Sequence, residues 1–137
     1  MGGLQGGSVR VFKNAWFERY AHKQHILDSS LRDAIARAEN GQIDADLGAG
    51  VIKQRVARKV QGKSGGFRAI VLYRAEGRAF FVYGFAKSDR ENIDDHEVTQ
   101  FKKAARHILG LTDEQLAELI HRGQFSEVHE NDTELPK

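Results

Sequence analysis

The sequence of 137 residues contains no cysteine, and only one proline, one methionine and one tryptophan. Without cysteine the chain cannot form disulfide bonds or bind zinc through thiolates, and this composition is typical of a reducing compartment, so we expect a cytoplasmic protein. No apolar run approaches the roughly 18 residues needed to cross a membrane. Residues 1–8 lack the basic and apolar regions of a signal peptide, and we interpret them as a flexible lead-in.

Hydrophobic residues make up 40% of the chain and include eight phenylalanines, which is enough to build a core. We therefore expect one domain of ordinary size, over residues 9–128. Residues 129–137 are polar, and a disordered tail is expected there. No internal repeat is visible.

The net charge of +2 hides an uneven distribution along the chain. Residues 1–52 carry equal numbers of acidic and basic side chains, residues 53–90 carry ten basic and two acidic ones, and residues 91–137 carry five basic and eleven acidic ones. A polyanion would be attracted to the middle segment. The distribution favours nucleic-acid binding over a chance clustering of surface charge.

Hydrophobic periodicity and capping residues predict an α+β domain. Strands are expected over residues 8–12, 51–58, 67–74, 79–85 and 125–128. Helices are expected over residues 14–22, from a cap at Asp28 or Ser29 to Gly41, from a cap at Asn92 or Asp94 to Gly110, and from a Thr112–Gln115 capping box to about Gly123. Residues 44–50 and 61–66 are expected to form a turn and a loop, and a hairpin turn over residues 75–78 is expected to use a positive φ at Gly77. The most apolar strand, residues 79–85, is predicted to be central and covered on both faces.

Strand alternation indicates that four cations share one face of the sheet. Lys53 and Arg55 are two residues apart in one strand, so their side chains project from the same side. Arg68 lies in the next strand. Lys87 follows the central strand, and if the backbone stays extended its side chain lies on the same face as that of Tyr83. With a suitable register, these three strands would gather the four cations on one surface.

Such a cluster suits cleavage of a phosphodiester bond in RNA. The attacking 2′-hydroxyl loses a proton, the phosphorane gains negative charge, and the 5′-oxygen leaves; arginine supplies rigid donors to phosphate oxygens, and crowded cations lower the pKa of a lysine. Spacing alone leaves open that these residues are solvated or only position phosphates. The remaining basic residues considered for RNA or ribosome contact are Arg58, Lys59, Lys63, Arg74 and Arg90.

Other motifs give weaker signals. The Gly-Lys-Ser triplet at 62–64 resembles the end of a P-loop, but Ala57 stands where the first glycine belongs, and a strand follows instead of a helix. His22 and His25 lie across a predicted helix end without a carboxylate at a recognisable interval, so no metal site is expected. None of the six histidines lies in residues 53–90, where a histidine acid–base pair would be needed.

Two acidic and several aromatic residues have open roles. Asp44 and Asp46 precede the cationic segment, and either orient its Arg or Lys side chains or only shape a turn and its hydration. Tyr73 and Tyr83 are able to stack on a nucleobase, although half-buried strand positions are the more common outcome. Trp16 is expected to pack against its helix.

Three blocks of sequence stand out together: DADLGAGVIKQRVAR over residues 44–58, QGKSGGFR over 61–68 and FFVYGFAK over 80–87. They closely resemble a branch of the RelE/HigB-type toxins of bacterial type II toxin–antitoxin modules. The resemblance covers roughly Arg10 to Val128. It implies a RelE-like α+β fold, with a mainly antiparallel four-stranded sheet, an N-terminal helical hairpin and, in this chain, extra C-terminal helices.

The resemblance also implies an activity and partners. These toxins are endoribonucleases (mRNA interferases) that need no cofactor or metal, and most cleave messenger RNA in the ribosomal A site. A cognate antitoxin, usually encoded beside the toxin, neutralises it by direct binding, and DNA is contacted only indirectly, through a DNA-binding antitoxin. No membrane partner is implied.

The resemblance also implies which residues are catalytic, and each is assigned by matching a motif of the family to this sequence. The paired basic residues of the second strand fall on Lys53 and Arg55, the arginine opening the third strand falls on Arg68, and the basic residue after the central strand falls on Lys87. In the best-studied RelE branch a tyrosine further along contributes, but residues 90–93 contain none. The general base is therefore open among Lys53, Lys87 and Tyr83.

The leading hypothesis is metal-independent mRNA cleavage that leaves a 2′,3′-cyclic phosphate and a 5′-hydroxyl. The alternative from another class is a ParE-like toxin that inhibits DNA gyrase through protein contact, without nuclease activity. A third reading is an inactive nucleic-acid-binding module, whose affinity would fall steeply with salt.

Overall fold

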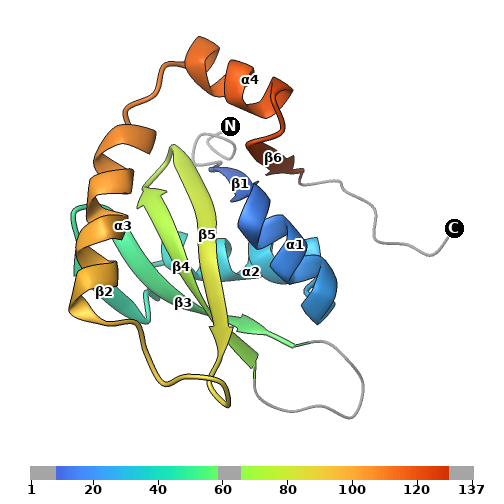
Figure 1. Cartoon of the computed structure of the whole chain (residues 1–137), viewed down its shortest axis with the longest axis vertical. Coiled ribbons are helices and arrows are strands. Elements are labelled where there is room, and N and C mark those ends of the chain that lie inside the picture. Colours follow the sequence, from blue (N-terminus) through green and yellow to red (C-terminus); the bar gives the residue numbers. More distant parts are fainter. Residues whose placement is uncertain (1–8, 59–65, 130–137) are drawn as a thin grey trace, which may run out of the picture.

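A six-stranded sheet with helices on both faces forms the body of the protein in the computed structural model, which describes residues 9–58 and 66–129 (Figure 1). The elements in chain order are β1 (Arg10–Asn14), α1 (Ala15–Gln24), α2 (Asp28–Glu39), β2 (Ala45–Gly48), β3 (Val51–Ala57), β4 (Gly66–Arg74), β5 (Arg78–Ala86), α3 (Asp95–Ile108), α4 (Asp113–His121) and β6 (Phe125–Val128). The strand order is β2-β3-β4-β5-β1-β6, with β1 and β5 parallel and the other neighbours antiparallel.

The mixed α+β class is as expected, but the expected four-stranded sheet is wrong, because six strands occur within the described residues. The strand that the sequence did not indicate is β2, which lies inside the stretch expected to be only a turn. The chain reverses at Ala49 and Gly50, which have φ values of 55° and 85°. The turn is therefore confined to these residues, and those before it pair with β3.

The predicted cap of α4, Thr112, is confirmed, and of the two candidates for α3 the structure has Asp94. The Asp94 side chain accepts a hydrogen bond from the Glu97 amide, and Thr112 accepts one from Gln115, with the reciprocal bond present in both capping boxes. The expected cap of α2 is wrong: Leu27 occupies the N-cap position, and the carboxylate of Asp28 accepts from Lys13 at 3.1 Å.

The hairpin turn between β4 and β5 also differs from expectation. The left-handed residue is Glu76, with φ of 60°, and not Gly77. A Cβ at Gly77 would lie 2.9 Å from Nε of Arg74, so a larger residue there would displace this side chain. The backbone N–H of Gly77 closes the turn by donating to the carbonyl of Arg74 at 3.0 Å.

Two apolar cores lie on the two faces of the sheet, and β5 contributes to both. Phe17 of α1 and Leu31 of α2 belong to one core, together with Phe81 of β5. The other core contains Phe80 of β5 and is packed against α3 and α4, with Leu116 fully buried. The expectation of a central strand covered on both faces is confirmed. Among the described residues, no helix is both long and apolar enough to cross a bilayer.

A β-bulge interrupts the pairing of β4 with β5. Ile70 is paired with Tyr83, whereas the next residue, Val71, is paired with Phe81. Val82 is therefore an extra residue in β5, and every residue after it faces the side opposite to the one that simple alternation would give.

The bulge determines which of the two cores each residue of β5 after Val82 faces. Phe80 and Phe85 belong to the same core, although their positions in the sequence differ by an odd number, which in a regular strand would place them on opposite faces. Gly84 instead faces α1, where a Cβ would lie 2.9 Å from the ring of Tyr20 and 3.1 Å from the ring of Phe17. Only glycine lets α1 lie this close to the strand.

Gly84→Ala should therefore lower the free energy of unfolding by about 1 to 3 kcal/mol, because the added methyl overpacks the space beneath α1. Gly110→Ala is the matched control, since a Cβ there would meet its nearest atom at an ordinary 3.5 Å. Urea denaturation measures both variants. Equal unfolding free energies for the two would contradict the close packing of α1 on β5.

Candidate active site

The register of β3, β4 and β5 arranges the predicted site residues in rows across the sheet. Arg55 is paired with Arg68, and Arg68 with Phe85. In the next row on the same face, Ile70 of β4 lies between Lys53 of β3 and Tyr83 of β5. These residues share the face that carries the α3 core, because the bulge has turned Tyr83 and Phe85 toward it.

A cavity of about 320 Å³ opens at the end of this face, where β4 begins and β5 ends. Its lining residues are Arg55, Arg58, Gly66, Arg68, Ala86, Lys87 and Ser88. Ion pairs between described residues involve other cations, namely Arg10, Lys13, Arg37, Arg78, Arg90 and Arg122. Within the described part of the chain, no carboxylate is paired with the four cations that surround this cavity, which we call the cationic cavity.

Lys53 does not line the cationic cavity. Its Nζ donates a hydrogen bond to Oδ1 of Asn92 at 3.1 Å, one row away from the Arg55–Arg68 pair. The same Asn92 oxygen accepts from the backbone N–H of Ile93 at 2.9 Å. The partner of the Lys53 amine is therefore a neutral amide, not a carboxylate.

Tyr83 is held on several sides. Its hydroxyl accepts a hydrogen bond from Nη1 of Arg90 at 3.1 Å. Its ring centroid lies 4.8 Å from that of Trp16 and 6.1 Å from that of Phe101. Trp16 packs against Tyr20 of its own helix, as expected, and also links α1 to β5, while 38% of its surface stays exposed.

Arg90 is engaged with protein groups in this structure. Its guanidinium forms a bidentate pair with Glu97, at 2.7 and 3.1 Å, and its Nε donates to the carbonyl of Asn92 at 2.9 Å. The hydrogen bond from Arg90, together with one from the Asp94 amide, lowers the pKa of Glu97, and the same pair raises the pKa of Arg90. The Arg90 guanidinium therefore links Tyr83 to Glu97, while the side chain stays 32% exposed.

Other basic residues of the 53–90 segment lie elsewhere. Arg74 is at the opposite end of β4 from the cavity and donates to the carbonyl of Leu109 at 2.7 Å. Arg78 is only 5% exposed, and its guanidinium binds the carbonyl of Leu111 and the carboxylate of Asp113, which ties β5 to the connection between α3 and α4. Lys59, Lys63 and most of the 61–66 loop fall outside the described residues.

Of the predicted site residues, the structure brings Arg55, Arg58, Arg68 and Lys87 together around one cavity. Sequence reasoning missed the bracing contacts of Asn92 and Glu97. The sequence pattern did not single out Glu97, and nothing in the spacing of Asn92 indicated a contact with a strand 39 residues earlier.

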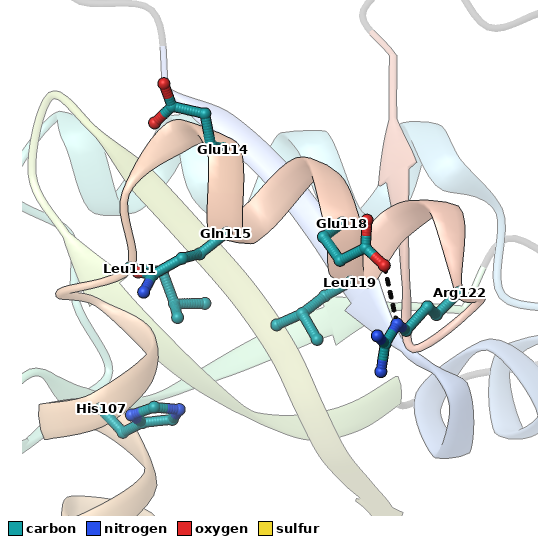
Figure 2. Close-up of a pocket in the computed structure, with 7 residues that line it drawn as sticks. All are labelled: His107, Leu111, Glu114, Gln115, Glu118, Leu119 and Arg122. Atoms are coloured by element: carbon teal, nitrogen blue, oxygen red, sulfur yellow. Dashed lines mark hydrogen bonds and ion pairs between the residues drawn. The ribbon is translucent and has the colours of Figure 1, made fainter.

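A second cavity, of about 480 Å³, lies between the end of α3 and α4 (Figure 2). Leu111, from the connection before α4, and Leu119 of α4 line this cavity together with His107, and Glu118 pairs with Arg122, another lining residue, at 2.8 Å. The two cavities share no lining residue. Its surface is mostly apolar, and its one arginine is paired with Glu118, so no cluster of cations converges there.

The comparison with known protein families gives a match over the same residues that form this fold. A family model described as "RelE toxin of RelE / RelB toxin-antitoxin system" matches residues 9–128, which run from β1 to the end of β6. No match to the chain occurs among curated proteins.

Arg90→Gln should raise the pKa of Glu97 toward its ordinary value of 4.5, because it removes the main group that holds the carboxylate ionised. Since the pKa is lower in the folded state, the stabilisation from this pair is present above about pH 4.5 and is lost as the pH falls through the lowered value. An NMR titration of the glutamate carboxyl carbons measures this. Arg122→Gln, which removes the comparable pair with Glu118, is the control and should leave Glu97 unchanged. An identical Glu97 titration in both variants would refute the assignment.

Proposed function

The chain belongs to the RelE toxin family of toxin–antitoxin systems, and from this premise we propose that it is an endoribonuclease that cleaves messenger RNA at the cationic cavity. Membership in this family makes the chain a toxin and implies a cognate antitoxin. Cleavage of RNA, and its coupling to the ribosome, are the proposal.

The observation that carries the proposal is the pairing of Arg55 with Arg68 beside Lys87. Like charges placed directly opposite each other across two strands destabilise a sheet. A bound polyanion would relieve this repulsion. A cavity with four cations and no carboxylate pairing from the described residues is therefore suited to a phosphate of a nucleic-acid backbone.

The arrangement supports a mechanism in which the 2′-hydroxyl of a ribose attacks the adjacent phosphorus. The 2′-oxygen–phosphorus bond forms while the bond to the 5′-oxygen breaks, which yields a 2′,3′-cyclic phosphate and a 5′-hydroxyl. Arg68, in the middle of its row, donates to the oxygens on which negative charge develops. One such donor is worth about 10²- to 10³-fold in rate.

Two proton transfers complete this reaction. Lys87 lines the cavity with Arg68, and we assign to it the protonation of the leaving 5′-oxygen. Lys53 or Tyr83, one row away, accepts the proton of the 2′-hydroxyl. Arg58 lines the same cavity and stacks over Phe67 at 4.6 Å, which suits a fixed phosphate contact. Lys59 and Lys63 are proposed to hold RNA or ribosome, and Arg90 to brace Tyr83.

Arg68→Ala and Lys87→Ala should each reduce mRNA cleavage by about 10²-fold or more, because each removes a group that acts on charge in the transition state. Arg74→Ala is the matched control: it removes an arginine from the same strand and should keep full cleavage. Mapping of mRNA 5′ ends after induction in cells, and with purified ribosomes, measures the effect.

The chemistry of the new ends provides a second readout. A 5′-hydroxyl is phosphorylated directly by a polynucleotide kinase, whereas a 5′-phosphate is not. Growth arrest with intact messages, or arrest that persists in the Arg68 and Lys87 variants, would overturn the proposal and point to a toxin that acts through protein contact.

A further inference from the structure

The strand that carries Arg55 loses its outer neighbour just before this residue. On the side away from β4, β3 is paired with β2 only as far as Lys53, which lies opposite Ala45, the first residue of β2. Arg55 lies two residues further on, where none of the strands in residues 9–58 and 66–129 flanks β3 on that side. Its peptide N–H and C=O would be left without strand partners there, although β-strand peptide groups need them.

Two charged side chains take the place of the missing strand. The N–H of Arg55 donates to Oδ2 of Asp44 at 2.6 Å, and the C=O of Arg55 accepts from Nη2 of Arg37. Arg37 and Asp44 are themselves an ion pair, with 3.8 Å between Nη1 and Oδ2. Together they hold both peptide groups of a single residue.

This clamp determines how Arg55 meets Arg68. Because the N–H and C=O of Arg55 point to Asp44 and Arg37, the Arg55–Arg68 pair is of the non-hydrogen-bonded kind, in which paired Cα atoms are only about 4.5 Å apart. The two guanidinium side chains therefore start from the closest spacing that an antiparallel sheet offers. Their repulsion would push the end of β3 away from β4 if nothing held Arg55 from the other side.

Asp44 is itself held by a buried residue. Gln54 is fully buried, and its Oε1 accepts from the backbone N–H of Asp44 at 2.7 Å. Its Nε2 donates to the carbonyl of Ala34 in α2 at 2.9 Å and to that of Gln42 at 3.3 Å. The backbone of Asp44 is thus anchored to α2 through the hydrogen-bonded side chain of Gln54.

Asp46, two residues from Asp44, has a different role. Its carboxylate accepts from the N–H of Gly48 at 2.9 Å, inside the irregular end of β2 that leads into the turn. The sequence left two roles open for these aspartates. Asp44 holds the backbone of an arginine of the cationic cavity, and Asp46 shapes the chain where it enters the turn.

We propose that Asp44 and Arg37 are positioning residues for Arg55, and that they keep its guanidinium beside Arg68 so that both face one phosphate. The assignment rests on the proposed function, because Arg55 is taken to bind the RNA backbone. Neither side chain lines the cationic cavity, so both act through Arg55 and not on the substrate.

The test is a double-mutant cycle with Asp44→Ala and Arg55→Ala, read by mRNA cleavage with ribosomes. Asp44→Ala should lower cleavage by about 10- to 100-fold, the loss expected when a group that contacts the reacting phosphate is displaced by about an ångström. In the Arg55→Ala background it should have no further effect. Asp44→Asn keeps an oxygen that can accept from the Arg55 amide and should recover most of the activity. Asp46→Ala is the matched control and should match the wild type.

The binding of a 2′-O-methyl RNA, which cannot be cleaved by 2′-hydroxyl attack, is measured in the same variants. If the wild type binds this RNA but cleaves no message, the proposed function fails, while positioning is still judged by whether the Asp44 and Arg55 losses in affinity are non-additive. If Asp44→Ala does not fold, Arg37→Met replaces it in the cycle. Equal losses in the presence and absence of Arg55, or equal effects of Asp44→Ala and Asp46→Ala, would overturn the proposal.

Discussion

The extra residue Val82 in β5 is the feature on which the arrangement of the candidate site depends. Up to Phe81 the strand alternates between the two cores, and after Val82 the alternation is reversed. Tyr83 and Phe85 thereby join the face that carries Lys53, Arg55 and Arg68. The side chain of Asn14, which also caps α1, donates to the carbonyl of Val82 at 3.2 Å. The bulge is therefore supported by the same residue that starts the helix packed on Gly84.

The cationic cavity lies at the margin of a strongly apolar sheet. Burial of β5 on both faces supplies the stabilisation that allows two arginines to be paired across neighbouring strands at the cavity end. Around them, charge is handled in two ways. Arg90 is neutralised by Glu97 and directed to Tyr83, whereas Arg55 keeps its guanidinium at the cavity while Asp44 and Arg37 bind only its backbone.

Local sequence signals predicted the elements whose formation depends on near neighbours. The capping box at Thr112 was recognised, and Asp94 was one of two candidate caps for α3, because capping partners lie within four residues of each other. β2 was missed because its pairing depends on a reversal through a non-glycine residue, Ala49, with positive φ. The cap of α2 was misassigned because Asp28 binds Lys13, a contact across the fold that no local pattern carries.

The sequence alone determined the charge excess of residues 53–90, the alternation that gives Lys53 and Arg55 a common face, and the resemblance to RelE toxins, because composition, periodicity and motif are local properties of a chain. Only the tertiary structure decided which cations meet. Strand register, the bulge and the end of β2 together place Arg68 opposite Arg55, leave Arg74 at the far end, and bury Arg78. Cross-strand pairing joins residues distant in sequence, and a shift of one position reverses every face, so no local pattern specifies it.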